Sequence, residues 1–310
     1  MLASLFRRSA FLFAFTASGL IAQDRPAASS APATGSSPAV EQSQPEPETF
    51  AQALAAKGIK LVHSPATVKL GGVADLKLPD GFFAIDPGSL KKFYEFTHNS
   101  ISDRAVGVII APGDWMLFFD YDESGYVKDE EKNSLDAGKL MKSMTANQDA
   151  ANEERTKRGW DEMKVAGWSS EPHYDAKTHN LKWAIKLTSS RDNHKSYWIN
   201  ESIRLLGRGG VMEVTLVTNN ETFTTDSAAA DSLLAQSYTY VSGQRYAEFK
   251  QGDKMAEYGL AALVLGGAGA VAFKMGFLQK FGKLIVYAVV GLGGAIAKFW
   301  NKITGRNPRS

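Results

Sequence analysis

Between residues 49 and 253, short apolar stretches alternate with turn-forming residues. Residues 67–70 and 73–78 alternate apolar and polar side chains around a Gly-Gly pair, which is typical of a β-hairpin. Residues 106–111 and 115–121 are the most apolar segments of this region and are separated by Pro112, Gly113 and Asp114. Because a Pro-Gly-Asp sequence favours a turn, we expect two paired central strands.

A helix and a second group of strands follow. Asp136 is a candidate N-cap, and apolar residues at helical spacing extend the predicted helix to Gly159. Four strand-like segments come next, at residues 162–168, 180–187, 196–206 and 211–218; shorter helices are predicted over 50–57, 86–96 and 227–236, and a last strand near 238–241. Strands and helices occur in blocks rather than in βαβ alternation. The pattern therefore predicts an α+β fold, with an antiparallel sheet and flanking helices.

The C-terminal region has a different pattern. Two apolar runs, at residues 258–273 and 284–297, lie in a segment that has no Asp or Glu and seven Lys or Arg. We interpret residues 254–310 as a membrane anchor of one or two helices with a basic tail, which contacts the lipid bilayer. Sixteen residues of helix span about 24 Å, slightly less than the roughly 30 Å hydrocarbon core.

Two arrangements of this anchor fit the sequence. In a hairpin both runs cross the membrane; in a single crossing one run spans and the other packs at the interface. Ala262, Gly266 and Ala270 form a stripe of small residues, and such stripes let helix backbones approach closely. This stripe favours the hairpin, or self-association of two chains. The third alternative is a buried helical hairpin in a soluble protein.

The N-terminus resembles an export signal. Arg7 and Arg8 precede an apolar run at residues 9–22, so residues 1–22 are predicted to be a signal peptide, with an uncleaved anchor as the alternative. Residues 23–48 are rich in Ala, Ser, Pro and Gln, which predicts a disordered linker. Either leader places the α+β domain, residues 49–253, on the periplasmic side of the inner membrane.

Composition narrows the possible functions. The chain has 310 residues, a formal net charge of +2 and no cysteine. Without cysteine it has no disulfide, thiolate nucleophile or Cys-ligated metal. The positive charge is concentrated in the leader and the tail, so the domain itself is acidic. An acidic domain lacks the basic surface that nucleic acid requires, whereas the basic tail fits anionic lipid headgroups.

One acidic segment matches the spacing of a calcium-binding loop. Asp120, Asp122 and Ser124 occupy positions one, three and five, a glycine occupies position six, Tyr126 could offer its carbonyl, and Glu131 occupies position twelve. A predicted strand, rather than a helix, enters this loop. Calcium is therefore the candidate cofactor, and an acidic turn between a strand and a helix is the alternative.

A second cluster contains His173, Asp175 and His179. One carboxylate and two imidazoles within seven residues could form a zinc site or an acid/base pair. On a hairpin loop the same residues commonly form the turn, with Asp175 bonding to its own backbone.

Several arginines near the end of the domain form a third group. Arg204, Arg208 and Arg245, with Asp253, suit recognition of a carboxylate or phosphate. The alternative is structural, with an arginine tying the last strand to the segment that precedes the anchor.

Several segments together resemble one protein family. They are YDESGYVKD at 121–129, LLGRGG at 205–210, GQRYAEF at 243–249 and DKMAEYGLAAL at 253–263, with Trp168 and PHYD at 172–175. These segments are similar to the domain-of-unknown-function 2167 family of predicted membrane-anchored bacterial proteins. The resemblance implies an exported domain and brings no assigned reaction or catalytic residue.

Two function hypotheses follow. The first is a non-enzymatic binding or scaffold module in the bacterial envelope, whose partner is an envelope protein or a second copy of the chain. The alternative is a periplasmic metal-dependent enzyme that uses the Asp120–Glu131 loop or the histidine cluster. The Gly-x-Ser-x-Gly motif of a hydrolase nucleophile elbow is absent.

Overall fold

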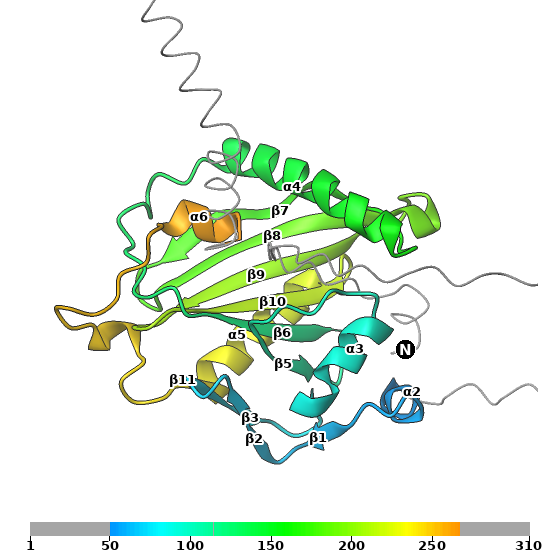
Figure 1. Cartoon of the computed structure of the whole chain (residues 1–310), viewed down its shortest axis with the longest axis horizontal. Helices are drawn as coiled ribbons and strands as arrows, with labels where there is room; N and C mark the ends of the chain where they lie inside the picture. The colour runs from blue at the N-terminus through cyan, green and yellow to red at the C-terminus, as the bar shows by residue number, and fades with distance from the viewer. Residues whose placement is uncertain (1–49, 114, 267–310) are drawn as a thin grey trace, which may run out of the picture.

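A large antiparallel sheet forms the centre of the domain. The computed structural model describes residues 50–113 and 115–266 (Figure 1). The eight strands of the large sheet, in spatial order, are β1 (Leu61–His63), β4 (Phe83–Ile85), β5 (Ala105–Ile110), β6 (Met116–Asp122), β10 (Val211–Asn219), β9 (Trp198–Leu206), β8 (Asn180–Ser189) and β7 (Met163–Asp175). All neighbours in this sheet pair antiparallel.

A smaller sheet and several helices cover the two faces of the large sheet. The three-stranded sheet has the order β11 (Tyr238–Tyr240), β3 (Ala74–Leu78) and β2 (Ala66–Leu70). The α-helices are α2 (Phe50–Ala56), α3 (Leu90–Phe96), α4 (Ala137–Lys157), α5 (Phe223–Ser237) and α6 (Leu260–Val264), and the 3-10 turns are η1 (Pro87–Ser89), η2 (Ser190–Asp192) and η3 (Tyr246–Glu248). Figure 1 shows α3, α4 and α6 in front of the large sheet and α5 behind it.

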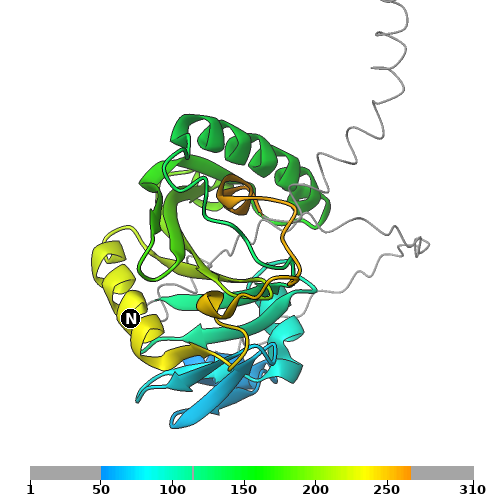
Figure 2. The ribbon, with the colours of Figure 1, turned by 90° about the vertical axis from the view of Figure 1, so that its left-hand side faces the viewer.

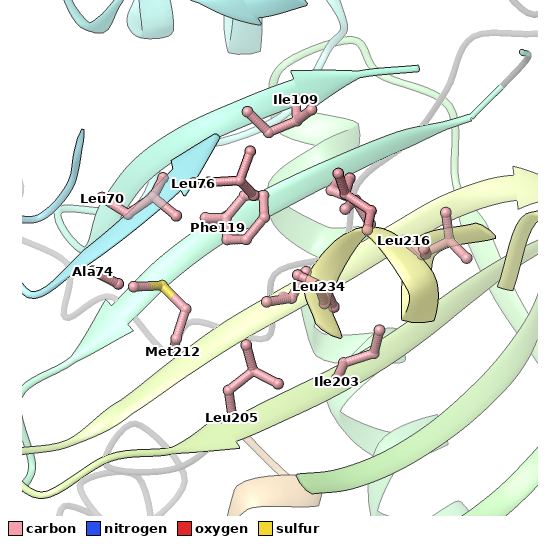
Figure 3. Close-up of a cluster of buried hydrophobic side chains, with 14 of the residues drawn as sticks. Leu70, Ala74, Leu76, Ile109, Phe119, Ile203, Leu205, Met212, Leu216 and Leu234 are labelled. Atoms are coloured by element: carbon pink, nitrogen blue, oxygen red, sulfur yellow. The ribbon is translucent and has the colours of Figure 1, made fainter. Parts of the chain in front are cut away.

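The period-two alternation of strand side chains divides the core between these faces. On β6, Leu117 and Phe119 pack with the small sheet and α5, whereas Met116 and Phe118 pack with α2 and α3. Figure 3 shows the first cluster, in which Leu76 of the small sheet and Leu234 of α5 lie over the large sheet. A third cluster joins α4 and α6 to β8; it includes Leu140, Met144, Trp183, Leu187, Leu260 and Leu263.

The predicted elements are largely confirmed. The hairpin becomes β2 and β3, and the two apolar segments become the paired strands β5 and β6. Asp136 caps α4, since its Oδ1 accepts a hydrogen bond from the Lys139 N–H at 3.0 Å. The α+β class with an antiparallel sheet is therefore correct.

Strand β7 is longer than the pattern indicates. The predicted strand ends at Trp168, whereas β7 continues to Asp175. Its pairing with β8 shifts register at three places, which interrupts the alternation of side chains. Pro172 lies on this edge strand, within the register shift between Ser170 and His173, and prolines in sheets are found at edge strands and bulges.

The predicted leader, linker and most of the predicted anchor lie outside the described residues. Within residues 50–113 and 115–266, no helix is long and apolar enough to cross a membrane. The first turn of the apolar run at 258–273 forms α6, and its Leu260, Leu263 and Val264 are buried in the third core cluster. This part of the run therefore packs on the domain.

Candidate functional site

A groove of about 680 Å³ lies where the β7–β8 turn, α5, β11 and η3 meet. Figure 2 looks onto this end of the domain, with α5 in yellow and η3 in gold. The groove has an apolar floor and a polar rim. It is lined by His173, Asp175, Thr178, His179, Asn180, Lys182, Leu205, Leu206, Asp231, Leu234, Ala235, Tyr238, Thr239, Tyr240, Arg245, Tyr246 and Ala247.

All three members of the predicted histidine cluster line this groove. Asp175 closes the β7–β8 turn, since its Oδ1 accepts from the Lys177 N–H at 2.8 Å and its Oδ2 from the Thr178 hydroxyl at 2.9 Å. These hydrogen bonds, the one from the backbone of Lys177 first, hold the pKa of Asp175 below its ordinary value. Asp175 thus has the turn-forming role that the alternative interpretation gave it.

The two histidines are held differently. His173 lies on β7, with Nδ1 3.2 Å from the Glu171 carbonyl oxygen. His179 has a positive φ of 54° in the turn, its Nδ1 is 3.1 Å from the Tyr174 hydroxyl, and its ring centroid is 4.4 Å from that of Tyr246. His179 is therefore packed as part of the groove wall, and His173 is exposed at its rim.

The lysine of the groove is neutralised by neighbours from β9 and α5. Lys182 Nζ lies 2.7 Å and 2.8 Å from the two carboxylate oxygens of Asp231 and 3.3 Å from Glu201. Burial raises the pKa of Glu201, and the charge of Lys182 opposes that rise. Pattern analysis did not identify Lys182 or Asp231, because α5 brings Asp231 to β8 from 49 residues away.

Arg245 supplies a solvated positive charge at the rim of the groove. Its side chain is 56% exposed, and its guanidinium lies 4.0 Å from Glu248. The other oxygen of Glu248 accepts from the backbone N–H groups of Gly243 and Arg245, which holds η3 in place. Arg245 was among the predicted arginines, and it is the one that lines the groove.

The other two predicted arginines have structural partners. Arg208 donates two hydrogen bonds to Asp253, of 2.7 Å and 2.6 Å, and this pairing lowers the pKa of Asp253 to about 2. Arg204 is buried, with its Nε 3.8 Å from Glu213 and its guanidinium 4.8 Å from the centre of the Trp183 ring.

A buried ionic network surrounds Asp120, the first residue of the predicted calcium loop. Arg104 lies 3.2 Å from Glu213 and 3.2 Å from Asp122. Burial, then the charge of Glu213, raises the pKa of Asp120 to about 6, although Arg104 opposes the rise. Glu213 is the one acid of β10, an otherwise largely apolar strand, and this is the signal from which the network could have been suspected.

The other predicted calcium ligands contact residues 254–264, which we call the C-terminal strap. The Tyr258 hydroxyl donates to Asp122 at 2.5 Å and lies 2.7 Å from the Ser124 hydroxyl. Glu131 accepts from the Ala261 N–H at 2.8 Å. The backbone of Tyr126 donates to the Lys254 carbonyl and accepts from the Ala256 N–H. Asp122, Ser124, Tyr126 and Glu131 are thus all engaged by the strap.

Metal binding by either predicted cluster stays a prediction. Within the described residues, no group of three or more His, Asp or Glu side chains is placed to hold a metal ion. In the acidic loop, a cation would have to replace the hydrogen bonds that Tyr258, Ala256 and Ala261 make.

Comparisons with known proteins show the family but leave the function open. No curated protein matches the chain. A solution structure of cyanobacterial PsbP from Synechocystis sp. is 12% identical, has a TM-score of 0.32 and covers 59% of this chain and 92% of that chain. The crystal structure of the Saccharomyces cerevisiae Ran-binding protein Mog1p is 12% identical, has a TM-score of 0.29 and covers 62% and 98%. Likenesses of this size say nothing about ligand or partner.

The family comparison covers most of the chain. Residues 62–297 match the family described as protein of unknown function (DUF2167), which is the family that the sequence segments resemble. The match begins within β1, extends past α6, and includes the groove and the strap. This chain therefore belongs to the DUF2167 family of proteins of unknown function.

Proposed function

We propose that this protein is a non-enzymatic binding module of the bacterial envelope, held at the inner membrane by its C-terminal region with the domain on the periplasmic side. The observation that carries the proposal is the groove at the end of the large sheet. Its volume of about 680 Å³ is within the range of roughly 300–1,000 Å³ found for ligand sites. Its buried floor is apolar and its rim carries polar and charged side chains, so it can hold a ligand of mixed apolar and polar character.

The charges of the groove favour a ligand that has an apolar body and a carboxylate. The carboxylates of Asp231 and Asp175 are already engaged, by Lys182 and by the β7–β8 turn. Arg245 is solvated at the rim, and His173 lies beside the same groove. The guanidinium can therefore receive an acidic group, while Leu234 and its neighbours receive the apolar part.

The strap supports a single crossing as the mode of anchoring. With Leu260, Leu263 and Val264 buried in the core, only residues 265–273 of the first apolar run remain. Nine residues of helix span about 14 Å, too short for a roughly 30 Å core. A single crossing by residues 284–297, extended by Phe299 and Trp300, leaves the basic tail in the cytoplasm, as the positive-inside rule favours.

The described residues give the enzyme alternative no support. The predicted calcium ligands Asp122, Tyr126 and Glu131 already accept hydrogen bonds from the strap. The imidazole of His179 packs against Tyr246 in the groove wall. A metal-dependent reaction would therefore need whichever of the two sites it uses to rearrange.

The groove can be tested with a small probe and a blocking variant. N-acetyl-leucine combines an apolar body with a carboxylate, and its binding to the full-length protein in detergent can be followed by nuclear magnetic resonance. Ala235 is an exposed helix residue that lines the groove, so we expect Ala235→Trp to abolish binding without unfolding the domain.

The matched control is Ala229→Trp, which adds the same ring to an exposed position of α5 outside the groove lining. Binding should be retained in this variant and weakened in Arg245→Gln. Equal binding by both tryptophan variants would place the ligand elsewhere and contradict the proposal.

A further inference from the structure

The groove contains the free edge of a β-sheet. β11 is the edge strand of the small sheet and pairs only with β3 among the described residues, with Tyr238, Thr239 and Tyr240 opposite Leu76, Asp75 and Ala74. The Val241 N–H donates to the Val73 carbonyl in the same register. Since hydrogen-bonded pairs alternate along an antiparallel ladder, Thr239 directs its backbone groups at β3.

It follows that Tyr238 and Tyr240 direct their backbone groups away from β3. The Tyr238 N–H donates to the Leu234 carbonyl at the end of α5. Among the described residues, no backbone hydrogen bond reaches the Tyr238 carbonyl or the Tyr240 N–H and carbonyl. An unpaired row of this kind is a template for another strand.

The unpaired edge and the groove are in the same place. All three residues of β11 line the groove, together with Leu234 and Ala235 of α5 and Arg245, the N-cap residue of η3. The side chains of an added strand would alternate, one toward the apolar floor and the next toward solvent and the rim. A solvated arginine at the end of such an edge suits an acidic side chain or a carboxylate.

We propose that the ligand of this groove is an extended peptide that adds to β11 as a fourth strand of the small sheet, with an acidic group at Arg245. The proposal rests on the proposed function, since it names the ligand class of the same groove. In either direction, the carbonyl of one peptide residue accepts a hydrogen bond from the Tyr240 N–H. The N–H of that peptide residue donates to the Tyr238 carbonyl if the strands are parallel, and to the Tyr240 carbonyl if they are antiparallel. Backbone pairing supplies affinity, and the floor and Arg245 supply selectivity.

Methylation of single peptide amides tests the pairing. The probe is a blocked tetrapeptide of valine, leucine, valine and aspartate, titrated into the full-length protein in detergent by calorimetry. Two matched peptides carry one N-methyl group each, on the second or on the third residue. Because alternate amides of a strand point in opposite directions, we expect one methylated peptide to bind at least tenfold more weakly and the other to bind as the parent does.

The protein variants separate this proposal from the broader one. Ala235→Trp should abolish binding of all the peptides, and Ala229→Trp should abolish none. If both methylated peptides bind as tightly as the parent and Ala235→Trp still blocks them, strand addition is wrong but the groove remains a binding site. If the parent peptide does not bind the wild-type protein, whereas N-acetyl-leucine binds it and Ala235→Trp abolishes that binding, only the assignment of the ligand as a peptide fails. If neither probe binds, both proposals fail.

Discussion

At the scale of single residues, the most unusual group in the domain is Asp120. This carboxyl group is 4% exposed, and Glu213 faces it from the neighbouring strand β10. Arg104 and Arg204 compensate in part, yet burial and Glu213 together raise the pKa of Asp120 to about 6. The ionic network therefore contains a carboxyl group that titrates in a range where ordinary aspartates are already ionised.

This pKa predicts an unusual dependence of stability on pH. In the unfolded chain Asp120 ionises near 3.8, whereas in the folded chain it ionises near 6. Between these values the unfolded state binds fewer protons, so ionisation of Asp120 lowers the free energy of unfolding as pH rises from about 4 to 6. A shift of this size corresponds to about 3 kcal/mol.

The measurement is urea denaturation at a series of pH values. In Asp120→Asn the free energy of unfolding should no longer show the decrease between about pH 4 and 6 that Asp120 contributes. Asp80→Asn, at an exposed position, should show the same pH dependence as the wild type. Parallel curves for wild type and Asp120→Asn would show that Asp120 has no raised pKa.

At the scale of elements, the important contact is between the acidic loop after β6 and the C-terminal strap. Four of the predicted calcium ligands contact the strap: Asp122, Ser124, Tyr126 and Glu131. The strap in turn places Leu260 and Leu263 against α4 and β8. The loop thus links the domain to the segment that leads toward the predicted anchor.

Tyr258→Phe should loosen this link. The substitution removes the hydroxyl that bonds Asp122 and Ser124, and the net loss for two hydrogen bonds is about 1–2 kcal/mol in the free energy of unfolding. Hydrogen exchange of the full-length protein should also show faster exchange in residues 254–264. The control is Tyr197→Phe, since Tyr197 is 47% exposed; equal effects of the two substitutions would mean that the hydroxyl of Tyr258 stabilises nothing.

Calcium and the strap compete for the same loop atoms. Calcium would have to displace Tyr258 from Asp122 and the Ala261 N–H from Glu131. Because these contacts come with the burial of α6, we expect the strap to persist. Millimolar calcium should then leave the melting temperature and the exchange rates of residues 254–264 unchanged. A rise in melting temperature that Asp122→Ala abolishes would establish the loop as a calcium site.

At the scale of the whole molecule, the proposal to test is that the C-terminal region anchors the chain in a membrane. Because α6, the start of the first apolar run, is packed on the domain, the proposal is a single membrane crossing by the second apolar run. The absence of cysteine makes this testable, because a single introduced cysteine is the only thiol in the chain. We expect Ser310→Cys to be protected from a membrane-impermeant maleimide in spheroplasts.

The control for this experiment is Ser242→Cys, an exposed position of the domain, which should be labelled. Labelling of both cysteines would indicate the hairpin. If the full-length protein stayed in the supernatant after high-speed centrifugation, membrane anchoring itself would be refuted.

The sequence by itself determined most of the secondary structure, because the relevant signals are local. The alternation around Gly71 and Gly72 predicted β2 and β3, and Asp136 marked the start of α4. The short spacing of His173, Asp175 and His179 in the sequence predicted that they lie close together, and all three line one groove. Periodicity, capping and turn residues act within a few positions, so they can be recognised without the fold.

Only the tertiary structure decided which atoms are left to bind a ligand. The spacing of the acidic loop is local, but its ligands are engaged by a strap that lies about 130 residues away in the sequence. Likewise Asp231 neutralises Lys182, and β11 becomes an edge, only because the chain order of the strands differs from their spatial order. Local patterns predict hairpins such as β2–β3, but pairing between strands that are distant in the sequence, such as β11 with β3, and the hydrogen bonds between distant segments depend on the whole fold.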